Sequence, residues 1–209
     1  MARLLYVKTS PRHERAYSTR AADAFIEDYR AANPDDEIEE LDLWRNELPR
    51  FDGEILAAKY AKLRRMDFTP EQDAAWAAVQ AVIDHFRGFD KMVFAIPMWN
   101  FTVPYVLKHY IDIIVQPGVT YGVDSEGKLR GFVEGKKALC ICASGSPYDG
   151  DAPLAPGDFL RPYLQWIFKW IGIEDLRIEM IAPTTKGDEL ATQALERATA
   201  ACRKLAKEF

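Results

Sequence analysis

The sequence has few cysteines, no excess of positive charge and no long apolar run. Three cysteines among 209 residues are an odd number, so they do not make a disulfide framework. A formal net charge of -5 gives no basic surface for nucleic acid, and we expect no nucleic-acid partner. No apolar stretch approaches the roughly 20 residues that span a bilayer, and no secretory leader opens the chain. We therefore expect a soluble cytoplasmic protein without a membrane contact.

The sequence also lacks the residue spacings that bind metals. His13, His85 and His109 are isolated, and none stands in a His-Glu-x-x-His or Cys-x-x-Cys arrangement. Cys140 and Cys142 fall in one predicted strand, where we expect buried thiols on opposite faces rather than two ligands of one ion. No metal site is predicted.

Motifs for nucleotide phosphates and for nucleophilic hydrolysis are missing too. There is no Gly-x-Gly-x-x-Gly and no Gly-Lys-[Ser/Thr], so neither a dinucleotide turn nor a triphosphate cradle is available. There is also no Gly-x-Ser-x-Gly elbow. A flavin-free hydrolase or a regulatory binding module therefore has no support from motifs, although a fold alone does not fix a function.

What the sequence does contain is a regular alternation of strand and helix patterns. This alternation predicts an α/β fold, in which a five-stranded parallel sheet has helices on both faces. Apolar runs predict strands, and apolar residues at helical spacing predict the helices between them. The predicted strands are 3–8, 37–43, 92–96, 138–142 and 176–181, and the predicted helices are 18–32, 70–86, 103–114, 159–171 and 188–209.

Three segments stand out from this alternation. Residues 44–68 form a connection much longer than the usual length of roughly two to six residues, and we expect a lid there that contains a mixed helical segment with Tyr60 and Leu63. Residues 119–133 predict a hairpin. The helix at 159–171 carries aromatic residues on more faces than one core needs, so we expect part of it in a subunit interface.

The third predicted strand ends in an unusual set of side chains, Pro97-Met98-Trp99-Asn100-Phe101. In parallel sheets, ligands bind at the carboxyl ends of the strands. A thioether, an indole, an amide and a phenyl ring at that position suit a flat aromatic cofactor. The simpler alternative is a hydrophobic plug between the loop and the sheet. The fourth strand runs into Ala143-Ser144-Gly145-Ser146, a loop that offers backbone donors with little bulk.

The first loop carries hydroxyl groups next to the start of a helix. Ser10, Ser18 and Thr19 lie there with Arg20, and the free N–H groups at a helix N-terminus favour a phosphate. The alternative is that Ser18 only caps the helix. Three loops at one edge thus offer phosphate donors, a flat apolar wall and a glycine turn. Together they predict a site for flavin mononucleotide (FMN).

The sequence resembles the FMN-dependent NADH azoreductases, also described as NAD(P)H quinone reductases. The resemblance covers essentially the whole chain. It rests on Lys8-Thr9-Ser10 with Tyr17-Ser18, on Pro97-Met98-Trp99-Asn100-Phe101, on Leu107-Lys108-x-Tyr110-x-Asp112, and on Gly118-Val119-Thr120 with Gly135-Lys136-Lys137-Ala138.

This resemblance implies one flavodoxin-like FMN-binding domain over residues 1–209, a doubly wound three-layer sandwich that forms a homodimer. The sequence departs from the family at Ser18-Thr19-Arg20, where relatives often have Ser-x-Ser, and at 143–146, where they have Ser-x-Gly-Gly. The implied FMN contacts are Ser10, Ser18, Thr19, Arg20, Pro97, Met98, Trp99, Asn100, Phe101, Ala143, Ser144, Gly145 and Ser146.

The resemblance also implies a ping-pong reaction. NADH or NADPH reduces the flavin and leaves, and a flat quinone or azo compound is then reduced in its place. The flavin carries the chemistry, so no catalytic side chain is assigned. Asn100 is expected to tune the ring, with Trp99 and Phe101 as walls. Tyr60 and Tyr121 are candidates for stacking on the substrate, although plain packing explains them equally well.

One alternative function remains open, that of a flavodoxin-like carrier of single electrons. A carrier needs an exposed ring edge and no lid, so the long connection at 44–68 argues against it. The sequence does not decide between NADH and NADPH and does not name the physiological acceptor.

Overall fold

Five strands form one parallel sheet in the computed structural model, which describes residues 1–64, 66–67 and 69–209. Parallel strands need long crossover connections, and each connection here contains at least one helix. The strands lie in the order β2, β1, β3, β6, β7, the doubly wound order that the flavodoxin-like prediction requires. Their bounds are β1 Arg3–Lys8, β2 Glu37–Asp42, β3 Lys91–Pro97, β6 Lys137–Ala143 and β7 Asp175–Ile181.

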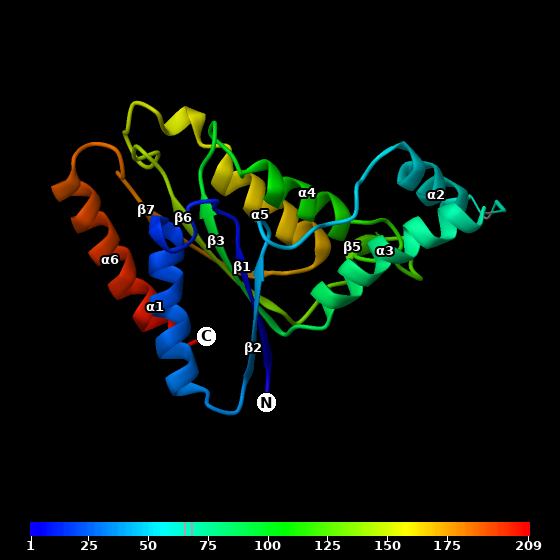
Figure 1. Ribbon diagram of the computed structural model, residues 1–209, viewed down its shortest axis with the longest axis horizontal. Helices are drawn as coiled ribbons and strands as arrows, with labels where there is room; N and C mark the ends of the chain where they lie inside the picture. The colour runs from blue at the N-terminus through cyan, green and yellow to red at the C-terminus, as the bar shows by residue number, and fades with distance from the viewer. Residues whose placement is uncertain (65, 68) are drawn as a thin grey trace.

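Helices cover both faces of the sheet, as Figure 1 shows. On one face α1 (Tyr17–Ala32) and α6 (Asp188–Ala206) pack side by side. On the other face lie α3 (Pro70–Arg87), α4 (Tyr105–Ile114) and α5 (Leu160–Ile171). The predicted three-layer α/β architecture is therefore confirmed.

Each central strand sends alternate side chains into two separate cores. In β6, Leu139 and Ile141 face α1 and α6, whereas Cys140 and Cys142 both face the helices of the other side. The expectation that the two thiols point to opposite faces was wrong, because residues two apart on a strand point to the same side. Both thiols are fully buried, as expected.

The start of α3 follows the local signal in the sequence closely. The Thr69 hydroxyl accepts the Gln72 N–H at 3.2 Å, and the Gln72 side chain accepts the Thr69 N–H at 3.1 Å. This reciprocal pair is a capping box, with Pro70 at the first helical position.

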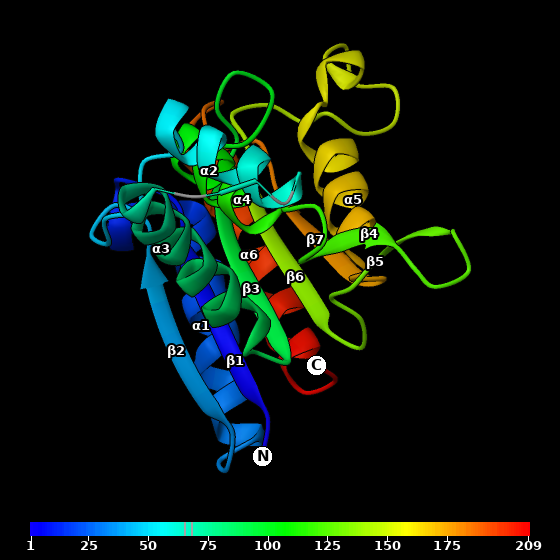
Figure 2. The same cartoon turned by 90° about the vertical axis from the view of Figure 1, so that its right-hand side faces the viewer.

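The long connection between β2 and β3 contains an additional helix, α2 (Gly53–Leu63). Ile55 and Ala58 of α2 pack against Trp76 and Val79 of α3, forming a small core of their own. In Figure 2 the two helices stand on the side of the sheet that α4 and α5 cover. Phe68, the end of the predicted insertion, lies outside the described residues. The insertion thus packs on α3 through α2.

The predicted hairpin forms as β4 (Tyr121–Val123) and β5 (Leu129–Gly131), which pair in antiparallel fashion. It packs on α5, so closely that a Cβ atom at Gly131 would lie 2.0 Å from the Ile171 carbonyl carbon. Among the described residues, no helix has the length and apolar character needed to cross a membrane.

Candidate functional site

The loops that follow β1, β2, β3 and β6 meet at the carboxyl edge of the sheet, because these strands are parallel. Hydrogen bonds join the loops. The Thr9 hydroxyl donates to the Ala95 carbonyl at 2.8 Å, and the Met98 N–H donates to the Ala143 carbonyl at 2.7 Å. The residues predicted from the first, third and fourth strand ends therefore share one edge.

The loop after β1 turns sharply around Ser10. Ser10 is buried, its hydroxyl accepts the Arg12 N–H at 3.3 Å, and its carbonyl accepts the His13 N–H at 3.2 Å. A short 3-10 turn, η1 (His13–Arg15), then leads to Ala16 and the start of α1. The loop directs the N-terminus of α1 toward the edge where β1 ends.

The start of α1 contains two buried side-chain hydroxyl groups. Ser18 and Thr19 are at most 1% exposed, and neither hydroxyl has a hydrogen-bond partner among the described residues. The helix N-cap is Ala16, which has no side chain to accept a hydrogen bond. The alternative that Ser18 caps the helix was wrong, because Ser18 is already inside its first turn.

Unpaired buried polar groups are costly, so their presence needs a physical reason. Here the two hydroxyls accompany the first N–H groups of α1, which have no intrahelical acceptors. Hydroxyl and N–H donors at the positive end of a helix dipole are the donor set that a phosphate group requires. Arg20, the fourth predicted residue, is exposed. The observed donors fit a phosphate monoester.

The buried carboxylate of Asp42 contacts the loop that follows β1. Asp42, the last residue of β2, accepts the Trp44 N–H at 2.9 Å and lies 3.0 Å from Nδ1 of His13. His13 has a positive φ of 48°, a conformation that side chains usually avoid. The Asp42 contact holds this residue in place. Sequence analysis missed the pair because its members are 29 positions apart.

The segment after β3 is a tight two-residue turn. Trp99 and Thr102 exchange backbone hydrogen bonds at 2.9 and 3.1 Å, and Asn100 and Phe101 between them have φ values of 45° and 73°. This is the geometry of a type I′ turn, which asparagine tolerates but phenylalanine rarely adopts. Such strain persists where the surrounding structure enforces it, and it is common at binding sites.

The loop after β6 approaches the same turn. The Phe101 carbonyl accepts the Phe159 N–H at 3.2 Å, and the Phe101 ring lies edge-on to Tyr148, with centroids 6.2 Å apart. The Ser144 hydroxyl donates to the Ser146 carbonyl at 2.8 Å, so it serves the loop itself. Gly145 lies against Thr185, where a Cβ atom would come within 2.9 Å of the hydroxyl oxygen. This loop therefore presents mainly backbone.

The two tyrosines predicted to stack on substrate are held elsewhere in the protein. Tyr60 is an exposed residue of α2 and lies beside Arg64. Tyr121 packs on Trp170, near the end of α5 that is opposite to the carboxyl edge, with ring centroids 5.1 Å apart. Their role in substrate binding stays a prediction.

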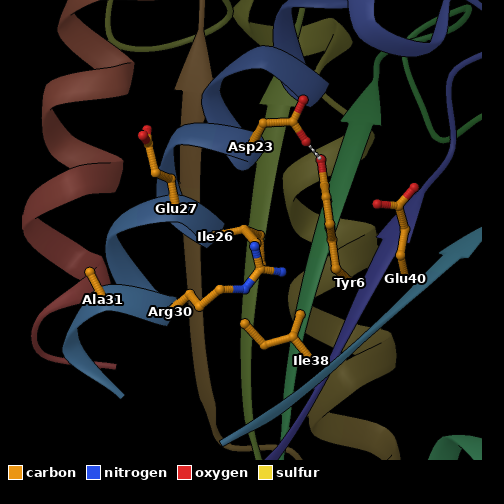
Figure 3. A pocket seen from close by; sticks show the side chains of 8 residues that line it. All are labelled: Tyr6, Asp23, Ile26, Glu27, Arg30, Ala31, Ile38 and Glu40. Atoms are coloured by element: carbon orange, nitrogen blue, oxygen red, sulfur yellow. Dashed lines mark hydrogen bonds between the residues drawn. The ribbon is translucent and has the colours of Figure 1, made fainter. Parts of the chain in front are cut away.

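A separate open groove of about 510 Å³ lies between α1 and the edge strand β2 (Figure 3). Tyr6 donates to Asp23 at 2.8 Å in this groove, and the Arg30 side chain extends over Ile38. Burial, with help from Asp23, raises the pKa of Tyr6 far above its ordinary value, so the phenol stays a neutral donor. With Asp23, Glu27 and Glu40 on its walls, the groove does not suit a phosphate.

Comparison with known proteins identifies the family of this chain. The family described as having a flavodoxin-like fold matches residues 2–206. A protein of Nitratidesulfovibrio vulgaris (strain DP4) named FMN-dependent NADH:quinone oxidoreductase is 41% identical over 211 residues, covering 100% of both chains. The chain belongs to this flavodoxin-like family of FMN-dependent NADH:quinone oxidoreductases. The family suggested by the sequence resemblance is confirmed.

Solved structures of azoreductases extend the similarity to three dimensions. An azoreductase from Bacillus anthracis str. Sterne is 29% identical, with a TM-score of 0.90 and coverage of 100% of both chains. An FMN-dependent NADH-azoreductase from Bacillus anthracis str. Ames Ancestor was solved in complex with FMN. It is 25% identical, with a TM-score of 0.85, over 99% of this chain and 100% of that one. Family membership thus accompanies a closely similar architecture.

Proposed function

We propose that this family member binds one FMN at the carboxyl edge of its sheet and uses NADH or NADPH to reduce quinones and azo compounds. The names of the most similar relatives support this activity. The observation that carries the proposal is that the buried hydroxyls of Ser18 and Thr19 have no hydrogen-bond partner in the part of the chain that the structure describes. They supply donors where the first N–H groups of α1 also lack acceptors.

In this proposal the phosphate end of the site, formed by Ser10 and residues 18–20, and its ring end, formed by residues 97–101 and 143–146, hold different parts of the cofactor. Ser10, Ser18 and Thr19 donate to the phosphate, and Arg20 lies near enough in sequence to add charge from the surface. The ring system lies against the backbone of residues 97–101 and 143–146, where Asn100 is placed at the tip of the turn. When bound, FMN supplies the two-electron transfer between nicotinamide and acceptor.

The protein residues of the ring end have a positioning role. The turn at Trp99–Thr102 is held by two backbone hydrogen bonds, and Phe101 is held against Tyr148. A rigid wall of this kind lets a nicotinamide and then an acceptor occupy the same position in turn. It also leaves little room for water. No side chain needs to act as a nucleophile, so substitutions at this end should change binding and rate without abolishing the reaction.

We also propose that the protein is a homodimer in the cytoplasm. Support for a dimer comes from α5, whose Trp166 and neighbouring Phe159 are each more than 60% exposed. Support for a reducing compartment comes from the three cysteines, which are all free and buried. Size-exclusion chromatography with light scattering checks the dimer directly.

Flavin binding gives the first test of the function. Purified apoprotein is titrated with FMN and, as a matched control, with riboflavin, which lacks the phosphate. We expect FMN to bind at least about 100-fold more tightly, because several charge-assisted hydrogen bonds are lost with riboflavin. Equal affinity would contradict the phosphate assignment. Under anaerobic conditions, FMN-loaded protein should then oxidise one equivalent of NADH per flavin, and should turn over further NADH only when a quinone such as 1,4-benzoquinone is present to accept the electrons.

The alternative to a reductase is a one-electron carrier, and the reaction with NADH distinguishes the two. A carrier would hold a stable blue semiquinone on stepwise reduction with dithionite and would not turn over NADH. The named relatives favour the reductase.

A further inference from the structure

Beside the ring end, three aromatic side chains from three different segments form one cluster. Trp44 follows β2, Trp99 belongs to the turn after β3, and Tyr105 opens α4. Their ring centroids lie 6.0 Å apart for Trp44 and Trp99, 5.4 Å for Trp44 and Tyr105, and 6.3 Å for Trp99 and Tyr105. We call these three residues the aromatic cluster.

Hydrogen bonds of Trp44 attach the aromatic cluster to the ends of β1 and β2. The Trp44 indole N–H donates to the Thr9 carbonyl at 3.0 Å, directly after β1, and the Trp44 backbone N–H donates to Asp42. The indole therefore has its polar group satisfied, and its ring remains available for contact. Trp44 also connects the phosphate end of the site with the ring end, since it touches Trp99.

The cluster is open to solvent on its outer side. Tyr105 is 65% exposed, and Trp44 and Trp99 are only partly buried. Single exposed aromatic residues are ordinary, but three that touch one another next to a binding loop form a surface that favours a flat partner. The rings are tilted by 49° to 81°, an arrangement that presents ring faces and edges together.

On the opposite side of the turn, Phe101 is 44% exposed but is held by packing. Phe101 packs on Tyr148, and a Cβ atom at Gly157 would lie 3.2 Å from the Phe101 ring. A molecule that extends from the ring end past Trp99 would therefore contact Trp44 and Tyr105, whereas on the other side Phe101 is already packed against Tyr148. A one-ring acceptor would remain over the ring end, whereas an acceptor with several fused rings would reach the cluster.

We propose that Trp44, Trp99 and Tyr105 bind the distal rings of extended aromatic acceptors and so determine acceptor specificity. This rests on the proposed function, because it assumes that acceptors are reduced at the ring end. The residues that the sequence suggested for stacking, Tyr60 and Tyr121, lie in other contacts within this chain. Trp44 and Tyr105 instead lie next to the predicted ring contact Trp99.

The test compares acceptors of different size in matched variants. Tyr105→Leu removes the aromatic ring at an exposed position, and Tyr105→Phe keeps the ring while removing the hydroxyl. KM is measured for 9,10-phenanthrenequinone, which has three rings, and for 1,4-benzoquinone, which has one. We expect Tyr105→Leu to raise the KM for the three-ring quinone about five- to tenfold and the KM for benzoquinone less than about twofold. Tyr105→Phe should resemble the unchanged protein.

A change of both KM values by the same factor, or of neither, would overturn the proposal, because a purely structural cluster predicts no dependence on acceptor size. Flavin uptake and reduction of the bound flavin by NADH are measured first in every variant. If the unchanged protein fails that step, the proposed function fails. The cluster is then tested without turnover by quenching of tryptophan fluorescence in oxidised, FMN-loaded protein with the three-ring quinone. Tighter quenching in the unchanged protein than in Tyr105→Leu supports the cluster, and equal quenching refutes it.

Discussion

The two ends of the candidate site are built on different physical principles. At the phosphate end, Ser18 and Thr19 are buried side chains whose hydroxyls have no partner among the described residues. At the ring end, the Ser144 hydroxyl is already used within its own loop, and what remains exposed is mostly backbone and aromatic surface. The phosphate end is therefore incomplete without a ligand, whereas the ring end is held in place by the protein alone.

This difference explains how the loop at 143–146 forms without particular side chains. At 143–146 the family's Ser-x-Gly-Gly is replaced by Ala143-Ser144-Gly145-Ser146, and the loop still forms because its bonds to residues 181–185 come from backbone groups and threonine hydroxyls. At the phosphate end the side chains themselves are the donors. We expect substitutions there to have the larger effect on FMN affinity.

The largest effect is expected for the double substitution Ser18→Ala with Thr19→Val. FMN affinity should fall about 100-fold, since two hydrogen bonds to a charged phosphate are worth about 3 kcal/mol together. The free energy of unfolding of the apoprotein should rise by about 1 kcal/mol, because two unsatisfied buried hydroxyls are removed. FMN titration and urea unfolding of the apoprotein measure these opposite changes.

Thr9→Val is the matched control for that pair. Thr9 is equally buried, but its hydroxyl donates to Ala95. Its removal should lower the stability of the apoprotein by about 1 kcal/mol, opposite in sign to the double substitution. Loss of apoprotein stability in both variants would show that Ser18 and Thr19 have partners within the protein, and the contrast between the two ends would disappear.

A smaller effect is expected from Asp42, which contacts His13 in the loop after β1. Asp42→Asn removes the charge that faces His13, so FMN affinity should fall about tenfold. Asp36→Asn is the control, because Asp36 also accepts two hydrogen bonds, from Tyr29 and from the Ala2 N–H, far from the site. It should lower the unfolding free energy and leave FMN affinity unchanged. Equal loss of FMN affinity in both variants would mean that Asp42 acts only through general stability.

At the ring end the backbone conformation should matter more than the side chain. Asn100 has a φ of 45°, so Asn100→Ala should be less stable than Asn100→Gly by about 1 kcal/mol. Both variants lose the amide, and their FMN affinities should differ less than their stabilities. Urea unfolding of the two variants provides the comparison. Equal stabilities would indicate that the turn relaxes when Asn100 is replaced.

The smallest effect is expected from the three buried thiols, Cys140 and Cys142 in β6 and Cys202 in α6. Burial raises the pKa of Cys140, of Cys142 and of Cys202, the last to about 12. Native protein at pH 8 should therefore not react with a thiol reagent, and unfolded protein should react at all three. Because the folded pKa values lie above the unfolded value of about 8.5, stability is complete below that pH and falls as the pH rises past it. Labelling before unfolding would contradict this burial.

Local patterns in the sequence predicted most of the fold. The capping box at Thr69 and Gln72 formed as expected, and the apolar runs became strands within one or two residues of their predicted bounds. The mixed helical segment predicted around Tyr60 and Leu63 in the long connection is confirmed by α2. Its packing against Trp76 of α3 was not visible in the sequence, because the contacts that stabilise such a helix are tertiary.

The candidate site was predictable in its position but not in its details. Ser18 and Thr19 were candidates because hydroxyls next to a helix start are a local signal, but only the structure shows that they lack partners among the described residues. The pair of Asp42 and His13 and the contact of Trp44 with Thr9 join residues that are distant in sequence. With one sequence, only the rule that strand ends carry ligands could have drawn attention to Asp42 and Trp44.

The most direct test of the central claim is anaerobic addition of NADH to the FMN-loaded protein while the visible flavin absorption band is recorded. The account predicts that the band bleaches directly to the two-electron reduced form and returns when a quinone is added. A band that NADH and NADPH leave unchanged, while dithionite produces a stable blue semiquinone, would contradict the reductase and favour an electron carrier.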